Sequence, residues 1–178
     1  AILKTGDHIV AASTLYGGTV GQLGVGFSRM GIETTFVDPS DPENFARAVR
    51  PNTRAMYGET IGNPLVNVLD IAAIAEVAHA HGVPLVIDNT VASPYLCNPL
   101  AFGADIVVHS ATKYIGGHGT TMGGVVVEGG KFPWDNGKFP EMMEPSRAYH
   151  GVKFYETFGD FGYTMKARLE VNRTFGGV

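Results

Sequence analysis

The stretch ADIVVHSATKYIGGHGTTMGG, residues 104–124, decides how the rest of the sequence is interpreted. The apolar residues 106–108 are typical of a buried strand, and a polar string that contains Lys113 follows before the chain breaks into glycines. In open α/β sheets, ligands bind just beyond the carboxyl ends of the strands, so this position indicates a binding site. The hydroxyls of Ser110 and Thr112 precede the lysine at a spacing that lets both reach one anion.

A lysine in this setting has two chemical uses. It can neutralise a phosphate, or, if it is desolvated, it can lose its proton and attack a carbonyl group. The alternative is an exposed lysine near a glycine turn, and this stretch alone leaves both interpretations open.

The composition limits the class of protein. A chain of 178 residues that is 44% hydrophobic and 17% charged predicts one globular domain. The low charged fraction also predicts that another domain or subunit covers part of the surface. A net charge of −4 without a basic block argues against nucleic acid as a partner, and no apolar run is long enough to span a membrane. The single cysteine, Cys97, favours a reducing compartment, the cytoplasm.

Outward from the central stretch, short apolar runs alternate with helical patterns. Asp41 precedes one helix, and Asp70 caps the clearest one, whose apolar residues recur at helical spacing until Gly82. His79 and His81 diverge around that helix and are expected to bind no metal. The alternation predicts an α/β fold with a mainly parallel sheet and helices on both faces. We expect strands at residues 8–12, 33–37, 54–59, 84–87, 106–108 and 124–128.

The pattern changes after Glu128. Residues 129–147 are rich in glycine, proline and aromatic residues, which predicts a long ordered loop that contains Trp134. A helix is expected at residues 155–175, loosened near two glycines. Because the chain opens with a pattern typical of a helix end, we interpret it as a piece of a larger protein.

Two further residues follow predicted strands and have alternative interpretations. Asp88 ends an apolar strand, where a carboxylate is costly unless it is paired, although it could simply cap the next turn. Tyr16 lies beside glycines, where it could either cover the core or lie flat on a planar ligand.

The flagged polar residues all follow strands, and this convergence predicts one site. A dinucleotide fingerprint is a poor match, because no third glycine follows Gly117 and Gly119 at the required spacing. Pyridoxal phosphate needs a lysine for its aldehyde, an acid for its ring nitrogen, hydroxyls for its phosphate and an aromatic ring to stack on. The set that meets this need consists of Tyr16, Asn63, Asp88, Ser110, Thr112 and Lys113.

Four motifs carry a resemblance to a known family. They are LYGGT at 15–19, ETIGNP at 59–64, DNT at 88–90 and SATKYIGGHG at 110–119. The sequence resembles the Cys/Met-metabolism family of pyridoxal-phosphate-dependent enzymes. The resemblance implies the aspartate-aminotransferase-like fold, known as fold type I, with residues 1–178 as part of its cofactor-binding large domain.

The resemblance also implies a role for each site residue. Lys113 would form the covalent bond to the cofactor aldehyde and act as the catalytic base, while Asp88 would keep the ring nitrogen protonated. Tyr16 would stack on the ring and assist proton transfer near the leaving group. The remaining contacts would be made by Thr90 to the other ring face, Asn63 to the ring hydroxyl, and Ser110 and Thr112 to the phosphate.

Within the family, the resemblance is strongest to the sulfhydrylases. Gly18 stands where methionine γ-lyases carry cysteine. The insertion of the sulfhydrylases is resembled by GGKFP at 129–133, with GKFP at 137–140 and YHG at 149–151. This implies a transferase of methionine biosynthesis that replaces the acetate of O-acetylhomoserine by sulfide or a thiol, giving homocysteine or methionine. It also implies a homotetramer built from dimers.

Two alternatives remain open on the sequence. One is a γ-lyase or a cystathionine enzyme of the same family. The other, from a different class, is a catalytically incomplete fragment that retains the fold. The fragment hypothesis is favoured because three family features are missing from the chain: the glycine-rich phosphate loop, the Tyr/Arg pair that reaches a neighbouring subunit, and the arginine for the substrate carboxylate.

Overall fold

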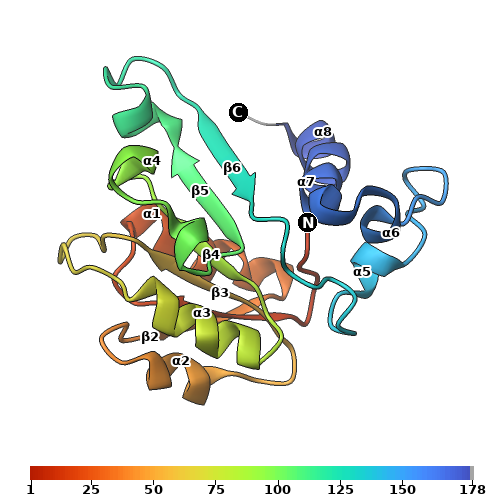
Figure 1. Ribbon diagram of the computed structural model, residues 1–178, viewed down its shortest axis with the longest axis horizontal. Helices are drawn as coiled ribbons and strands as arrows, with labels where there is room; N and C mark the ends of the chain where they lie inside the picture. Colours follow the sequence, from red (N-terminus) through yellow and green to blue (C-terminus); the bar gives the residue numbers. More distant parts are fainter. Residues whose placement is uncertain (177–178) are drawn as a thin grey trace.

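The computed structural model describes residues 1–176, and its centre is one six-stranded sheet with the order β2-β1-β3-β4-β5-β6 (Figure 1). Strands β1 to β5 are parallel, and β6 runs antiparallel to β5 with Gly124 opposite Ser110. The predicted mainly parallel sheet is therefore confirmed. The strands are β1 (His8–Ala12), β2 (Glu33–Val37), β3 (Thr53–Glu59), β4 (Leu85–Asp88), β5 (Ile106–Ser110) and β6 (Gly124–Glu128).

The helices are short, and two of them begin at the predicted caps. The Asp41 carboxylate accepts the Glu43 N–H at 3.0 Å, and the Asp70 carboxylate accepts the Ala73 N–H at 3.1 Å. The main helices are α1 (Gly17–Gly21), α2 (Pro42–Ala48), α3 (Ile71–Ala80), α4 (Ser93–Leu96), α5 (Pro140–Met143), α6 (Phe154–Phe158), α7 (Gly162–Lys166) and α8 (Arg173–Phe175). Single turns complete them: η1 (Gln22–Gly26), η2 (Ser28–Met30), η3 (Pro99–Phe102), η4 (Ala111–Ile115), η5 (Gly159–Phe161) and η6 (Ala167–Asn172).

One face of the sheet is covered by an aliphatic core. Successive side chains of a strand point to opposite faces, so Leu85 and Ile87 of β4 share a face with Val107 of β5. These residues join Ile74 and Ala78 of α3 in one buried cluster. In Figure 1, α2 and α3 lie together below the strands.

Over β4 and β5, the other face is covered by an aromatic cluster, formed by rings from the segment after β6. Trp134 and Phe139 meet edge to face with ring centroids 5.0 Å apart, and Phe132 packs against both rings. They join Ile106 of β5 and Phe154 of α6 in a second buried cluster. The predicted loop at 129–147 is thus ordered by its rings, and it contains α5 as well.

The C-terminal segment is a broken helix, as the sequence predicts. The turn η5 separates α6 from α7, and Gly159 there has φ +52°, a value that favours glycine. In Figure 1, α5 to α8 gather beside β6 and close to the N-terminus.

His8 ties three strands together inside the sheet. It is fully buried, its Nδ1 lies 2.8 Å from Thr53 Oγ1 of β3, and its Nε2 lies 2.9 Å from Thr35 Oγ1 of β2. Burial lowers the pKa of His8, and the nearby Arg50 charge acts in the same direction. His8 is therefore a neutral link in the sheet at neutral pH.

His79, near the end of α3, has an acidic partner. His79 Nε2 lies 2.8 Å from the buried Asp105 carboxylate, which joins α3 to the start of β5. Within residues 1–176, no three histidine, cysteine or acidic side chains gather as they would around a metal ion. None of the helices in this range has the length and apolar character needed to cross a bilayer.

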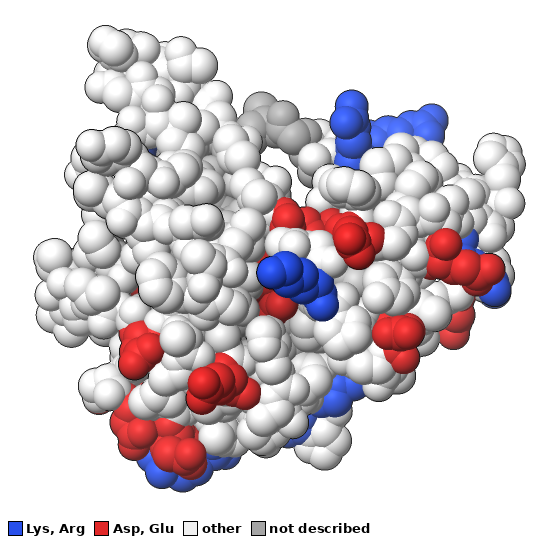
Figure 2. Space-filling model, viewed as in Figure 1, with Lys and Arg blue, Asp and Glu red and all other residues white. Residues whose placement is uncertain are grey.

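Charge is distributed unevenly over the surface. Figure 2 shows acidic and basic side chains over α2 and α3 and around α5 to α8, while the surface over α4 and the tip of β5 is almost free of them. Exposed apolar side chains lie on α4 and in the segment after β5, including Tyr95, Leu96, Tyr114 and Met122.

Candidate active site

A pocket of about 690 Å³ opens at the carboxyl ends of the strands. Its walls come from the segments that follow β1, β3, β4 and β5, which parallel pairing brings to one edge of the sheet. All the residues singled out in the sequence line this one pocket: Tyr16, Asn63, Asp88, Thr90, Ser110, Thr112 and Lys113.

Lys113 lies on η4, directly after β5. Its backbone angles, φ −92° and ψ −116°, depart from those of a helix, and its side chain is exposed toward the pocket. Thr112 closes this turn, because its hydroxyl accepts the Gly123 N–H at 3.0 Å and donates to the Gly123 carbonyl at 3.3 Å. The strand extends through Ser110, two residues further than the apolar run 106–108 indicates.

Asp88 is half-buried at the end of β4. Its Oδ1 accepts the Thr90 N–H at 2.8 Å, so one carboxylate oxygen caps the turn, as the alternative interpretation of this residue expects. Asp88 nevertheless lines the pocket, so this one side chain both caps the turn and forms part of the pocket wall. The Thr90 hydroxyl in turn accepts the Ser110 N–H at 2.8 Å and so joins the ends of β4 and β5.

Asn89 fixes the loop that follows β4. It is fully buried, and its Oδ1 accepts the Thr60 hydroxyl at 2.8 Å. Its amide group donates to the carbonyls of Ser93 and Cys97 at 3.1 and 2.8 Å. The buried Asn89 side chain, with its hydrogen bonds satisfied, therefore fixes the positions of its neighbours Asp88 and Thr90.

Glu59 is a pocket residue that the sequence analysis missed. It ends β3 beside Asp88 in the register of the sheet, is only 6% exposed, and accepts the Tyr16 N–H at 2.7 Å. Burial raises the pKa of Glu59 to about 7; the Tyr16 N–H opposes this shift, and the Asp88 charge adds to it. Its position in the sequence could have indicated it, because Glu59, like Asp88, is an acidic residue at the end of a buried strand.

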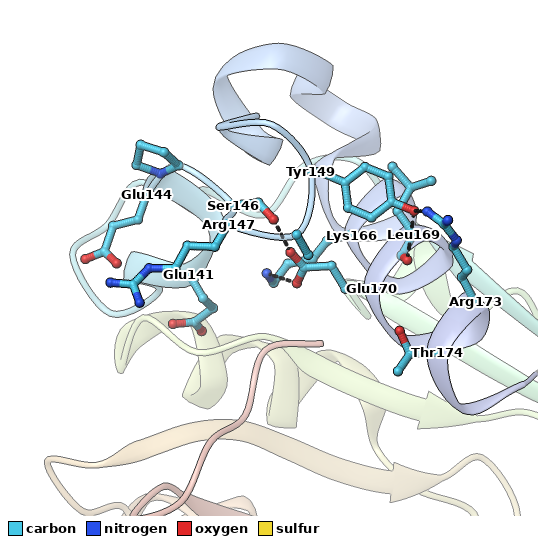
Figure 3. Close-up of a pocket in the computed structure, with 12 residues that line it drawn as sticks. Glu141, Glu144, Ser146, Arg147, Tyr149, Lys166, Leu169, Glu170, Arg173 and Thr174 are labelled. Carbon is cyan, nitrogen blue, oxygen red and sulfur yellow. Dashed lines mark hydrogen bonds and ion pairs between the residues drawn. The ribbon is translucent and has the colours of Figure 1, made fainter.

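A second pocket, of about 780 Å³, lies among α5, α7 and the turns that follow them (Figure 3). Several of its polar groups pair with one another, whereas the two buried carboxylate oxygens of Glu141 accept no hydrogen bond from the described residues. Lys166 pairs with Glu170 at 2.6 Å, Ser146 donates to Glu170, and Arg173 donates to the Tyr149 hydroxyl at 2.8 Å. The smaller pocket is the stronger candidate, because it gathers an amine, two carboxyl groups, hydroxyls and an exposed ring at the strand ends.

Known proteins resemble this chain closely. The model of the family described as Cys/Met metabolism PLP-dependent enzyme matches residues 1–159. An O-acetyl-L-homoserine sulfhydrylase of Leptospira meyeri is 54% identical over 98% of this chain and 41% of its own length. The homocysteine/cysteine synthase of Saccharomyces cerevisiae is 50% identical over 98% of this chain and 40% of its own length.

Solved structures show the same fold. A protein of Campylobacter jejuni described as an O-acetylhomoserine (thiol)-lyase, which carries a pyridoxyl-lysine phosphate, superposes with a TM-score of 0.94 at 28% identity. That match covers 99% of this chain and 44% of the other. An O-acetylhomoserine sulfhydrylase of Wolinella succinogenes gives a TM-score of 0.84 at 35% identity, over 99% of this chain and 47% of the other. The chain thus spans about two fifths of the length of the curated relatives it matches.

Proposed function

The chain belongs to the Cys/Met-metabolism family of pyridoxal-phosphate-dependent enzymes, and on this premise we propose that the pocket at the strand ends binds pyridoxal phosphate. The observation that carries the proposal is the gathering of Lys113, Asp88, Ser110 and Tyr16 around that pocket. We propose also that residues 1–178 form part of the cofactor-binding large domain of fold type I.

The donor set of the pocket fits this cofactor. Lys113 offers an amine for the aldehyde, Asp88 a carboxylate for a protonated ring nitrogen, and Ser110 and Thr112 hydroxyls for the phosphate. Tyr16 offers an exposed aromatic ring to stack on. In this proposal Thr90 contacts the other ring face and Asn63 the ring hydroxyl.

The chemistry follows from these positions. When bound, pyridoxal phosphate supplies an electron-withdrawing ring that stabilises negative charge on the carbon next to the substrate amine. Asp88 keeps that ring protonated through its charge, and Lys113 Nζ moves protons at the α- and β-carbons of the substrate. Tyr16 assists proton transfer near the leaving group.

We propose γ-replacement on O-acetylhomoserine as the reaction of the enzyme to which this chain belongs. Acetate leaves, sulfide or a thiol takes its place, and the product is homocysteine or methionine. This proposal is supported by the names of the relatives, which are sulfhydrylases and homocysteine synthases at about 50% identity.

Two statements about context belong to the same proposal. A homotetramer built from dimers is supported by the exposed apolar side chains near the pocket, such as Tyr95, Leu96 and Met122, on a surface almost free of charge. The cytoplasm is supported by Cys97, a single cysteine that has no partner for an internal disulfide.

The decisive experiment maps the covalent link. The chain is incubated with pyridoxal phosphate, reduced with borohydride and digested, and the pyridoxyl group is expected on Lys113. The matched control is Lys113→Ala, which should take no label, beside Lys131→Ala, which should be labelled like the wild type. A label on Lys4, Lys131 or Lys138 would overturn the assignment.

The reaction is tested on the enzyme by comparing substrates. O-acetylhomoserine with sulfide should give homocysteine and acetate faster than methionine or cystathionine alone gives α-ketobutyrate. The reverse order would make the enzyme a γ-lyase.

A further inference from the structure

Glu59 occupies a position in the pocket to which none of the proposed roles applies. It ends β3, it is only 6% exposed, and its carboxylate forms part of the pocket wall. Its hydrogen-bond partner is a main-chain group, the N–H of Tyr16, at a distance of 2.7 Å. The bond joins the end of β3 to the loop that follows β1.

The Tyr16 ring needs such a support. Tyr16 is 58% exposed, so packing against its neighbours holds the ring only in part. Tyr16 is the residue that precedes α1, where its N–H lies outside the helix and is available to an acceptor. A charged carboxylate at hydrogen-bond distance is a strong acceptor for such a group.

Gly18 leaves room for the ring on its other side. A Cβ atom built at this position would lie 2.5 Å from Cε1 of the Tyr16 ring. The ring therefore uses space that opens only because position 18 has no side chain. The hydrogen bond to Glu59 holds the Tyr16 main chain, and the absence of a side chain at Gly18 lets the ring lie against that position at the pocket wall.

We propose that Glu59 is a positioning residue, which holds the Tyr16 ring at the wall of the pocket by accepting the Tyr16 N–H. That the ring is held for a cofactor rests on the proposed function; the link between the two residues does not. Glu59 acts through Tyr16.

The charged groups around Glu59 make this support sensitive to pH. Asp88 faces it from β4, Tyr57 lies on its own strand, and Lys113 lines the same pocket from η4. Because Glu59 is buried beside the Asp88 carboxylate, it changes charge near neutral pH. The charged form makes the stronger hydrogen bond, so the support tightens as the pH rises through that range.

The first test needs no cofactor. In the chain labelled with ¹⁵N-tyrosine, the Tyr16 amide signal is expected to shift with pH around a midpoint near 7. Glu59→Gln, which keeps an acceptor but cannot change charge, should abolish that shift. Asp88→Asn should keep the shift and move its midpoint to lower pH, because it removes the charge that opposes ionisation of Glu59. A Tyr16 signal that titrates equally in wild type and Glu59→Gln would overturn the proposal.

The second test uses the chain loaded with pyridoxal phosphate. Glu59→Ala should change the visible circular dichroism of the bound cofactor and weaken its binding by about tenfold, the loss of one charge-assisted hydrogen bond. Glu59→Gln should restore most of both signals at neutral pH. In a Tyr16→Ala background, Glu59→Ala should have no further effect on them, which a merely structural role would not explain.

The outcomes separate this inference from the function proposed above. A wild-type chain that takes no borohydride label on Lys113 contradicts the proposed function, while the amide titration still decides the link between Glu59 and Tyr16. Normal labelling on Lys113 together with unchanged circular dichroism in Glu59→Ala leaves the proposed function standing and overturns the inference.

Discussion

Over β4 and β5, the two faces of the sheet are buried by different means. One face packs against α3, whose aliphatic residues such as Ile74 repeat with the period of the helix. The other is covered by the rings of Phe132, Trp134 and Phe139, most of them on backbone without regular structure. The difference teaches that a sheet face can be closed without a long helix when large rings interlock edge to face.

The two faces are also joined at one point. The segment that carries the rings turns back onto the end of α3, where Lys138 Nζ donates to the His81 carbonyl at 2.7 Å. The Asn136 amide donates to the Gly82 carbonyl at 3.0 Å nearby. These bonds satisfy carbonyl groups at the end of the helix, so the aromatic segment caps the element that covers the opposite face.

The largest effect is expected from Phe139→Ala on the aromatic face. Phe139 is fully buried between Trp134 and Phe132, so its truncation should lower the free energy of unfolding by about 4 kcal/mol. Urea unfolding followed by the fluorescence of Trp134, the only tryptophan, and by far-ultraviolet circular dichroism measures the loss.

The control for Phe139→Ala is Phe161→Ala on the turn η5, since Phe161 is 69% exposed and should change stability by less than about 0.5 kcal/mol. Coincident transitions by both probes would show that the two faces unfold as one unit. If Trp134 unfolded at lower urea while the helical signal persisted, the aromatic face would be a separate, weaker layer.

A smaller loss is expected from Ile74→Ala on the aliphatic face. Ile74 is fully buried on α3, and the removed methylene and methyl groups should cost about 3 kcal/mol. Glu76→Ala, on the exposed side of the same helix, is the matched substitution and should be nearly neutral. If Ile74→Ala cost more than Phe139→Ala, the irregular face would contribute less to stability than the helical one.

The sequence predicts the packing of one face better than that of the other, because only one face is covered by a periodic helix. The period of α3 and the apolar strands are local patterns. A mainly parallel sheet with an aliphatic helix on one face can therefore be predicted from short stretches of the sequence. The rings at 132, 134 and 139 have no period, and their contacts with Phe154 join distant parts of the chain. A local pattern predicts that this segment is ordered, but not which face it covers.

The site shows the same limit. Lys113, Asp88 and Tyr16 could be singled out because polar residues at strand ends converge on one edge of a parallel sheet. Glu59 stands at the same edge, but its partner is the Tyr16 main-chain N–H, which every residue except proline has. No pattern of side chains in the sequence predicts a hydrogen bond to a main-chain N–H.

The third prediction concerns the strands between the two faces and depends on pH. His8 has a lowered pKa in the folded protein, whereas the ordinary histidine pKa is 6.5, so the folded state takes up the proton less readily than the unfolded chain. Stability should therefore be unaffected by His8 above about pH 6.5 and fall as the pH drops below it. Each unit of pKa difference contributes about 1.4 kcal/mol.

Unfolding of the wild type and of His8→Gln between pH 5 and 8 isolates this contribution, with the range set around the ordinary histidine pKa. The variant should lose the part of the acid sensitivity that His8 causes. Parallel pH profiles for the two proteins would mean that the buried imidazole does not limit stability.

The smallest change in stability is expected from Gly18→Ala, outside both faces. Gly18 lies in α1, where alanine favours the helix, so the free energy of unfolding should change by less than about 1 kcal/mol. The added Cβ must displace the Tyr16 ring, so the visible circular dichroism of bound pyridoxal phosphate should change. Gly21→Ala in the same helix meets no atom within 4 Å and should leave that spectrum as it is. Equal spectra for the two variants would show that Tyr16 does not report on the site.

The reversal of β6 has a consequence for how this protein can evolve. Because β6 is paired antiparallel to β5, residues 111–123 leave the sheet at Ser110 and return to it opposite, at Gly124. The segment that carries Lys113 is therefore a loop that joins two adjacent, hydrogen-bonded strands. By contrast, the crossover between β3 and β4 must include the core helix α3. Doubling the length of such a loop raises the entropic cost of closing it by only about 0.6 kcal/mol. Insertions and deletions there can reshape the pocket mouth in descendants of this sequence without rebuilding either layer.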